Sequence, residues 1–552
     1  MDKKPDPTHA EHAADADASS IRKVASGGAP HDADEVDERA VALRLARTAD
    51  PGLKLATWRG LKFIFYVLVV CMCSGDSGFD GTIMSSVNSM VQFQRFFNLG
   101  TDGKGASKTG IVFGIYTVGQ VCAFFPAVVL PDRIGRRWTM FLANILLCGG
   151  AFLAGFAQNM SMFLAGRFLV GMGCTCAAQG AKSYLSEVTS PWNRGRWMGL
   201  QNSFYYVGQL LASGLAIPLG RIASNWSWRI PLILQCMLGF INVLFVLLLP
   251  ESPRWVYAQG RRDEAVKILA ELHSRDNDVN SPLVQLEIAE FEESISLTGA
   301  DKRPFDFRPL FTTSAQRYRF GMCVIVACWG QLSGNGLITY FLPILLKQAG
   351  IESPDRQRVL NFVNSVTSFI GALTGTSLVD FVGRRFLMLF AEISCMSGMF
   401  IVAGLLSNSG PQTSTRANAG ISFIFLFMVF YSFGWTPLQS LYPAESLAYE
   451  VRAKGLALQS WCTNIFSLIN TFGLPSALAA LKWKTYLIFG IWDIVGIIVI
   501  YLFVVETKQL SLEELDDVFN SPNPKQTSFA LAAEAKRREA EHIARQKAGG
   551  NA

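Results

Sequence analysis

Two charged residues lie inside long apolar segments of the sequence. Asp80 stands in Gly-Phe-Asp-Gly within the first segment, and Arg167 stands about two turns into the fourth. A charged side chain at the centre of a membrane costs about 2.5–3.5 kcal/mol on insertion scales, so each residue needs a partner or a task. The simplest interpretation is a static, buried ion pair, and the alternative is a pair with a functional task.

A second group of residues could hydrogen-bond a solute that is rich in hydroxyl groups. Amide side chains donate and accept hydrogen bonds without carrying charge, and aromatic rings cover the apolar faces of such a solute. Asn202 and Gln209 lie about two turns apart on one face of the fifth apolar segment, and Gln331, Asn335 and Tyr340 lie in the seventh. A single amide in a membrane helix often only joins two helices, so the argument depends on the whole set.

The apolar segments that carry these residues are each about 20 residues long, which is the length of a helix that crosses a bilayer. Of the 552 residues, 50% are apolar and only 17% are charged. The chain is therefore predicted to be an all-α membrane protein with twelve transmembrane helices. The segments cover about residues 61–86, 108–130, 138–157, 161–183, 197–219 and 229–249, and then 320–347, 357–380, 386–407, 417–442, 455–480 and 484–505.

Polar stretches divide the chain into five parts. The first stretch is rich in Asp, Ala, Lys and Arg and has no apolar core, so it is expected to be a disordered tail and not a signal peptide. Apolar residues at helical spacing predict two short surface helices in the central stretch, at 261–272 and 283–295. The predicted parts are a tail at 1–55, a six-helix bundle at 56–249, a linker at 250–319, a second six-helix bundle at 320–505 and a tail at 506–552.

Charge and composition argue against several other classes of protein. The net charge of +6 is spread over short loops, which does not favour nucleic-acid binding. All cysteines lie in apolar segments and all histidines lie outside them, so neither a metal site nor another cofactor is expected. The sequence has no nucleotide-binding loop and no catalytic triad, so an enzyme is not expected.

Two charged patterns occur once in each half of the chain. Asp-x-x-Gly-Arg-Arg follows the second segment and again the eighth, and a glutamate followed by an arginine seven residues later comes after the fourth and the tenth. Two ordered repeats at matching helix positions indicate a duplication, which is the plan of many secondary transporters. The repeated residues are Asp132, Arg136, Arg137, Glu187 and Arg194 in the first half, and Asp380, Arg384, Arg385, Glu445 and Arg452 in the second.

The repeated loops and the linker are richer in basic residues than the alternate loops, which places them and both termini on the cytoplasmic side. At that end the arginines are expected to pair with the acidic members of the repeats. Such pairs would latch the two halves together while a carrier faces outward and would break when it opens inward; the alternative is that the charges only set the topology. On the outer side, Asn159 and Asn225 are glycosylation sequons so close to the membrane that little use is expected.

Further motifs point to a family. Arg167 lies in Gly-Arg-x-x-x-Gly, Pro-Glu-Ser-Pro-Arg254 follows the sixth segment, and Glu506-Thr-Lys follows the twelfth. Together with the repeats, over about residues 60–520, the chain resembles the sugar porter branch of the major facilitator superfamily. Within the branch it is similar to fungal lactose and cellodextrin permeases, because the seventh segment reads Gly-Gln-Leu-Ser-Gly-Asn-Gly and Ser440 replaces a tryptophan of many hexose carriers.

The resemblance implies two pseudo-symmetric bundles and proton-coupled import of a di- or oligosaccharide or a hexose. It implies that Asp80 takes up the proton and that Arg167 keeps it charged otherwise, and that Asn202, Gln209, Gln331, Asn335, Tyr340 and Trp435 bind the sugar. The expected partners are a sugar, protons and the lipid bilayer, for a monomer in the plasma membrane. A carrier of a polyol, a quinate-like acid or a secondary metabolite is the alternative, and a sugar sensor is less favoured, because its tail would be longer.

Overall fold

The computed structural model describes residues 50–99, 103–190, 193–298, 305–348, 350–407, 414–448, 451–508, 510 and 512–531. Within them the chain forms helices and connecting turns, without strands. The long helices of the first half are α3 (Trp58–Asn88), α5 (Gly103–Cys122) with α6 (Phe124–Ile134), α7 (Arg136–Gly155), α8 (Met160–Val188), α9 (Arg194–Leu219), and α10 (Trp226–Leu234) with α11 (Met237–Phe245). Those of the second half are α15 (Ser314–Leu332) with α16 (Asn335–Gln348), α17 (Pro354–Val382), α18 (Arg384–Ser407), α19 (Ser414–Ser446), α20 (Arg452–Leu481) and α21 (Lys484–Phe503).

These helices account for the twelve predicted spans. In the described part of the chain, ten helical spans are long and apolar enough to cross a membrane. An eleventh is the pair α5 and α6, whose axes bend by 42° at their junction. The remaining predicted span is the fifth along the chain, α9. It has a similar length but is less apolar, because it carries Gln201, Asn202 and Gln209. It packs between α3 and α17 in the middle of the bundle, where polar residues need not meet lipid.

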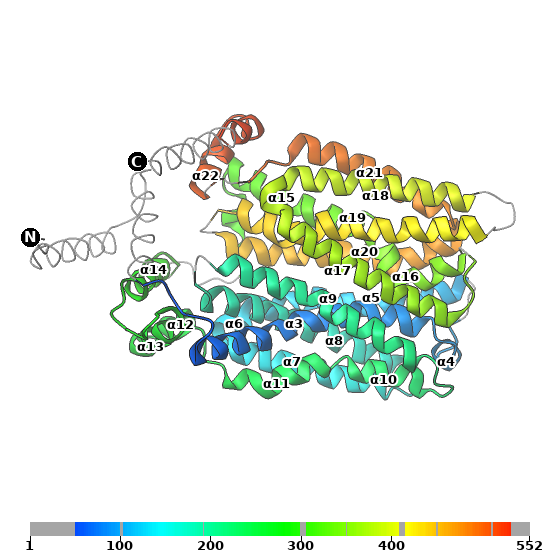
Figure 1. Cartoon of the computed structure of the whole chain (residues 1–552), viewed down its shortest axis with the longest axis horizontal. Coiled ribbons are helices and arrows are strands. Elements are labelled where there is room, and N and C mark those ends of the chain that lie inside the picture. The colour runs from blue at the N-terminus through cyan, green and yellow to red at the C-terminus, as the bar shows by residue number, and fades with distance from the viewer. Residues whose placement is uncertain are drawn as a thin grey trace, which may run out of the picture.

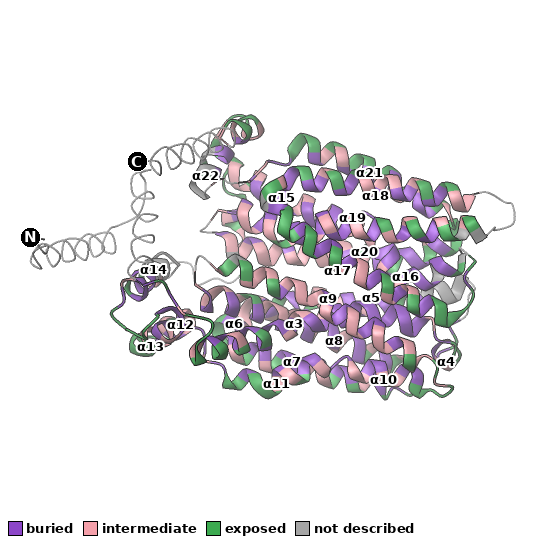
Figure 2. Ribbon diagram, viewed as in Figure 1, coloured by how far each residue is buried: buried purple, intermediate pink, exposed green. Residues whose placement is uncertain are grey.

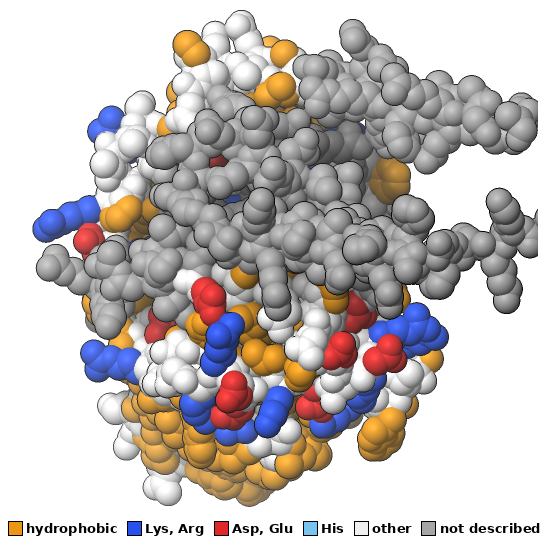
Figure 3. Space-filling model, turned by 90° about the vertical axis from the view of Figure 1, so that its left-hand side faces the viewer, with side chains coloured by type: hydrophobic (Ala, Val, Ile, Leu, Met, Phe, Trp, Pro, Cys, Tyr) orange, Lys and Arg blue, Asp and Glu red, His pale blue; other side chains and the backbone are white. Residues whose placement is uncertain are grey.

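The long helices run side by side in two groups, with the first half below the second in Figure 1. The short helices α12 (Pro253–Ala258), α13 (Arg262–His273), α14 (Pro282–Thr298) and α22 (Leu512–Asn520) lie at one end of the bundle, which we call the linker side. The opposite end, the far side, carries α4 (Val91–Phe96). Figure 3, which faces the linker side, shows acidic and basic side chains there and apolar side chains along the flank.

Exposed and buried residues alternate around the long helices, and the exposed ones are largely apolar (Figure 2). On α21, for example, Ile488, Ile491 and Leu502 are each more than half exposed, whereas Asp493 is fully buried. An apolar outer surface with polar residues turned inward is the arrangement that a lipid solvent demands. The chain is thus a multi-pass membrane protein, as the sequence predicted.

The seventh span is broken between α15 and α16. Gly334 joins the two helices with a φ of 93°, a left-handed conformation that costs any other residue free energy. Phe341 interrupts the regular helix a second time inside α16. The sequence Ser333-Gly334-Asn335 therefore marks a break that exposes backbone carbonyls in the middle of the bundle.

The linker helices form a small domain that the sequence largely predicted. The helices expected at 261–272 and 283–295 are α13 and α14, and they pack on each other through Leu269, Val284 and Ile288. The chain already binds this domain at residue 50, before the predicted end of the first tail at residue 55. The Asp50 carboxylate accepts hydrogen bonds from the Ser281 hydroxyl and from the backbone N–H of Arg275.

The predicted tail from residue 506 includes a helix, α22. Leu515, Val518 and Phe519 lie on one face of α22 and pack with Val505. Asp516 on the same helix pairs with Arg319 at the start of α15. The apolar residues of this charged segment recur at helical spacing and cover the end of the second half. Residues 1–49 and 532–552 lie outside the described part.

Candidate functional site

Asp80 and Arg167 form an ion pair in the interior of the first half. The Asp80 carboxylate on α3 contacts the Arg167 guanidinium on α8, and both residues are 2% exposed. The guanidinium also lies over the ring of Tyr116, 4.9 Å from its centroid. One oxygen of Asp80 has no hydrogen-bond partner in the described part of the chain. The pair that the sequence suggested is present, and one acceptor position of its carboxylate is open.

A second buried acid, Asp76, lies one turn before Asp80 on α3 and was not singled out from the sequence. One of its oxygens accepts a hydrogen bond of 2.9 Å from the backbone N–H of Gly239, at the start of α11. No cation pairs with it in the described residues. Asp76 therefore ties two helices of the first half together, whereas Asp80 faces an arginine.

The polar residues of the seventh span are held by α19 and α20. The break frees the carbonyls of Gly330 and Gln331, which accept hydrogen bonds from Tyr431 and Gln439 on α19 and from Asn470 on α20. In the same network, Gln331 donates to Gln439 at 3.4 Å. Every member of this cluster is an uncharged donor or acceptor. This network holds in place the amides that the sequence analysis named as candidate ligand-binding residues.

Asn335 belongs to this network and has a free acceptor. Its side-chain amide donates to the Tyr431 hydroxyl at 2.9 Å, and its oxygen is buried without a partner in the described part of the chain. Tyr340, two residues beyond Ile338 on α16, lies edge-on to Phe113 of the first half, with ring centroids 6.1 Å apart. Tyr340 thus stands where the two halves meet, whereas the hydrogen bond of Asn335 is to its own half.

The two amides of the fifth span lie on α9 as predicted. Asn202 is half-buried and Gln209 is buried, and neither side chain has a hydrogen bond to another described residue. Between them, Tyr206 crosses to the second half. Its hydroxyl is 2.8 Å from that of Thr436 on α19, and its ring stacks on Phe369 of α17. The face of α9 that carries Tyr206 therefore borders the interface between the halves.

Trp435 does not lie with the other proposed ligand-binding residues. It is fully buried inside the second half, and its indole N–H donates to the Glu392 carboxylate on α18 at 2.9 Å. The resemblance placed it near the sugar, but Tyr431 and Gln439 bond the Gly330 carbonyl on α15, whereas Trp435 bonds Glu392 on α18. The expectation that Trp435 contacts a ligand is not supported by this arrangement.

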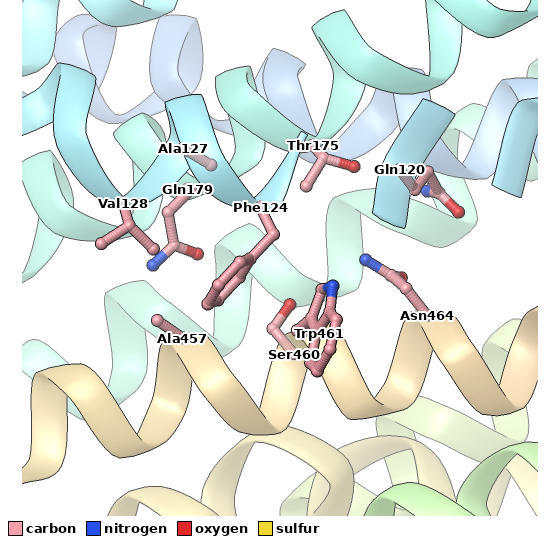
Figure 4. Close-up of a pocket in the computed structure, with 10 residues that line it drawn as sticks. All are labelled: Gln120, Phe124, Ala127, Val128, Thr175, Gln179, Ala457, Ser460, Trp461 and Asn464. Carbon is pink, nitrogen blue, oxygen red and sulfur yellow. The ribbon is translucent and has the colours of Figure 1, made fainter. Parts of the chain in front are cut away.

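A polar and aromatic pocket lies between the halves, toward the linker side from the broken span (Figure 4). The amides of Gln120 and Gln179 face it from α5 and α8, and Asn464 faces it from α20. The rings of Phe124 and Trp461 meet there, 5.3 Å apart. These residues have the same chemistry as those named above, but the sequence reasoning missed them. The only signal was an amide three residues after Trp461, on one face of α20.

The repeated charges at the linker side form the same cluster in each half. The Arg136 guanidinium contacts Asp132 at 2.9 Å and Glu187 at 3.0 Å. Arg384 donates to both oxygens of Glu445, at 2.8 and 3.1 Å. The pairing of arginine with glutamate is as predicted. Each glutamate belongs to the same half as its arginine, so these ion pairs do not join the two halves in the arrangement seen here.

The remaining gate residues also bind within their own half. Arg137 donates to the carbonyl of Leu249, and Arg385 donates to that of Tyr501, at 2.9 and 2.6 Å. The Arg452 side chain bonds the Leu447 carbonyl, and Arg194 is exposed at the start of α9. The side chain of Asp380 lies outside the described part of the structure.

A carboxylate caps the third span of each half. Glu251 accepts hydrogen bonds from the backbone N–H groups of Arg136 and Arg137 at the start of α7. Glu506 does the same for Arg384 and Arg385 at the start of α18. Carboxylates stabilise helix N-termini by neutralising free N–H groups and the positive end of the dipole. The Pro-Glu-Ser and Glu-Thr-Lys motifs therefore tie the end of each half to its third span.

A buried histidine joins the linker domain to α8. His273 contacts both oxygens of Glu287 at 2.8 Å and the carbonyl of Val188 at 3.0 Å. Burial by itself lowers the pKa of His273, but the Glu287 carboxylate and the Val188 carbonyl outweigh it and raise this pKa above its usual value. The imidazole thus favours its protonated form, in which both ring nitrogens donate.

Two bundles of six helices with a broken helix, a buried ion pair and a polar interface between the halves define a secondary membrane transporter, not an enzyme. Comparison with known proteins supplies the family. A family model described as "Sugar (and other) transporter" matches residues 66–519, and the chain belongs to this family.

Individual relatives are distant but cover most of the chain. A high-affinity glucose transporter of Kluyveromyces lactis is 26% identical over 473 residues, 82% of this chain and 84% of that protein. A probable polyol transporter of Arabidopsis thaliana is 26% identical over 393 residues, 70% of this chain and 73% of that protein. The inward open structure of the xylose transporter XylE from E. coli has a TM-score of 0.67 at 19% identity, over 82% of this chain and 98% of that chain, which supports the major facilitator fold.

Proposed function

We propose that the protein imports a sugar together with protons, by exposing a site between its two halves alternately to either side of the membrane. The observation that carries this proposal is the Asp80–Arg167 pair, buried in the first half with one carboxylate oxygen unpartnered. A carboxyl group that can lose its cationic partner and gain a proton changes charge inside the membrane, as proton coupling requires. A proton:xylose symporter has the same fold.

The proposed sugar site combines the broken seventh span with the pocket toward the linker side. Asn335 has a free acceptor, and the pocket adds amides, hydroxyls and the ring of Trp461. Such a set suits a solute with many hydroxyl groups and a few apolar faces. The two regions follow one another along the interface, and an elongated site of this kind favours a di- or oligosaccharide, with a hexose as the smaller possibility. We retain Asn202, Gln209, Gln331 and Tyr340 as contacts.

We further propose that the linker side is cytoplasmic and that the membrane is the plasma membrane. The basic loops support this orientation. Contacts between the halves occur near the far side, where Asn361 bonds Ser86 at 3.2 Å, and also toward the linker side, where Phe124 packs on Trp461 with centroids 5.3 Å apart. Asn159 and Asn225 precede α8 and α10 on the far side, so glycosylation would occur outside the cell.

Uptake of radiolabelled solutes by proteoliposomes tests the proposal. The panel contains glucose, lactose, cellobiose, a polyol and quinate, each with an imposed proton gradient and with a protonophore. We expect accumulation of one of the sugars that the protonophore abolishes. A polyol is the second candidate, because a probable polyol transporter is among the relatives. Accumulation of the polyol or quinate alone would overturn the sugar assignment, and binding without any flux would favour a sensor.

A further inference from the structure

The two halves carry a buried polar contact at the same position, with different chemistry. Asn144 and Glu392 each lie twelve residues after the aspartate of their Asp-x-x-Gly-Arg-Arg loop, on α7 and α18. In the first half, Asn144 donates to the Asn242 side chain at 2.8 Å, and Asn242 donates to the Val69 carbonyl at 2.8 Å. The amides thus provide the hydrogens that this contact between spans requires.

In the second half, the equivalent contact joins two acids. Glu392 and Asp493 are both fully buried on the packed helices α18 and α21, where each carboxyl group is close enough to act on the other. One oxygen of Glu392 accepts the Trp435 N–H at 2.9 Å. The other oxygen of Glu392 and both oxygens of Asp493 have no donor in the described part of the chain. Ionised carboxylates only accept hydrogen bonds, so this contact lacks a hydrogen.

The surroundings of the pair supply donors and exclude water. Trp329 is 7% exposed, and its indole N–H has no acceptor in the described residues. A Cβ on Gly496 would lie 2.3 Å from the Trp329 nitrogen and 2.5 Å from a Glu392 oxygen, so both atoms border the notch at this glycine. The ring of Trp492 stacks on Trp329 and covers the site, with centroids 5.3 Å apart.

Few other titratable groups face the pair. They are the thiols of Cys328 on α15 and Cys395 on α18. The described residues of α17, α19 and α21 bring no lysine or arginine into contact with either carboxyl group. Two unpaired negative charges this close, away from water, would cost several kcal/mol or more, whereas one proton between them removes the repulsion and provides the missing hydrogen bond.

We propose that Glu392 and Asp493 form a second proton-binding site, separate from Asp80, in which one proton is shared between the two carboxyl groups. A metal cation fits less well, because indole N–H groups border the site and would point toward it. No cluster of three possible metal-ligating acids, histidines or cysteines is present in the described part.

Trp435 connects this site to the proposed sugar site. It lies one turn after Tyr431 and one turn before Gln439 on α19, the residues that hold the broken seventh span. Loss of the shared proton would strengthen the acceptor of the Trp435 N–H and so bias the position of α19. This coupling to transport rests on the proposed function, whereas the presence of the proton does not.

Infrared spectroscopy of the purified full-length protein tests the proposal, because a protonated carboxyl group has a C=O band that a carboxylate lacks. Carboxyl groups in water are ionised at about pH 7, so a band at this pH reports a buried proton. We expect the wild type to show such a band, and Glu392→Gln and Asp493→Asn each to lose it. In either variant the new amide supplies the hydrogen, as the Asn144–Asn242 pair does naturally in the first half.

The outcomes are distinguishable. Loss of the band in both single variants, with its retention in Asp80→Asn, supports the shared proton even if Asp80 has no role in coupling. An unchanged band in both variants overturns the proposal, and loss of half of the band in each would mean two protons instead of one. Disappearance of the band on adding Na⁺ or K⁺ at constant pH would assign the site to a metal cation. Monodispersity on size exclusion confirms that each variant is folded.

Discussion

The Arg167 guanidinium binds the Asp80 carboxylate and lies over the ring of Tyr116, so two different groups compete for one cation. A ring attracts a cation by about 0.5–2 kcal/mol and needs no charge to do so. Tyr116 therefore offers Arg167 a neighbour that remains when Asp80 is protonated. Proton uptake by Asp80 need not leave a buried guanidinium without any partner.

Asp80→Asn is predicted to abolish accumulation and to preserve exchange. A membrane potential of about −100 mV gives about 2.3 kcal/mol per charge, and one pH unit gives about 1.4 kcal/mol. Together they support a few-hundred-fold concentration ratio in the wild type, and without a proton-accepting carboxylate this ratio falls to one. Uptake and counterflow in proteoliposomes measure the two properties separately.

Asp76→Asn is the matched control, since Asp76 is equally buried one turn away but bonds a backbone N–H instead of an arginine. It is expected to keep concentrative uptake. Accumulation by Asp80→Asn, or its loss in Asp76→Asn alone, would show that the coupling carboxylate is not Asp80.

Asn335→Ala is predicted to raise the KM for sugar about tenfold, with a smaller effect on the maximal rate. A hydrogen bond between an uncharged amide and a hydroxyl contributes about 0.5–1.5 kcal/mol, and the Tyr431 hydroxyl also loses one of its two donors, keeping the one from Gln439. Initial rates of uptake over a range of sugar concentrations measure both constants. Ser397→Ala is the control, because Ser397 is half-buried on α18 and bonds only its own helix. Equal KM values for both variants would remove Asn335 from the site.

Gly334→Ala is predicted to destabilise the protein and to impair transport. The left-handed conformation costs an alanine about 1–2 kcal/mol, and its Cβ would lie 2.3 Å from the Met399 methyl group. Gly404→Ala, on the neighbouring α18, meets no atom within 4 Å and is expected to be neutral or slightly stabilising. Melting temperatures in detergent compare the two variants. A neutral Gly334→Ala would mean that the break in the seventh span tolerates a regular residue.

The stability of the linker domain is predicted to fall as the pH rises. The folded protein raises the pKa of His273, so it binds a proton more tightly than the unfolded chain does. The stabilisation is complete below about pH 6.5, the ordinary pKa of histidine, and is lost as the pH rises through the higher pKa of the folded state. Melting temperatures of the wild type and of His273→Gln should therefore differ most at acidic pH and converge at alkaline pH. A constant difference would show that the contact does not depend on protonation.

The sequence was most informative where a residue conflicted with its surroundings. Asp80 and Arg167 stood out because charges are rare in apolar segments, and their pairing followed from that cost. The repeated loops indicated two related halves because an unusual pattern recurred in order. Fold, span number and this ion pair were thus predictable from composition and spacing.

The neighbour that each side chain contacts was harder to predict from the sequence. Trp435 contacts α18 and Gln439, one turn further, contacts α15, and this difference depends on how α19 packs against α15, α17 and α18 together. The pocket near Trp461 is lined by α5, α6, α8 and α20 from both halves, so no single segment predicts it. Glu392 and Asp493 lie about 100 residues apart in separate apolar segments, so their proximity also depends on how α18 packs on α21.

The caps at Glu251 and Glu506 bear on how the two halves can move. Each cap fastens the end of the last span of a half to the start of its third span, and each arginine–glutamate cluster lies beside its cap. Each half can then tilt as a rigid body without breaking any of these ion pairs. The free-energy difference between the two orientations is then determined by the contacts that change, such as the hydroxyl pair of Tyr206 and Thr436. Such contacts are weak enough for a bound sugar to decide which orientation is favoured.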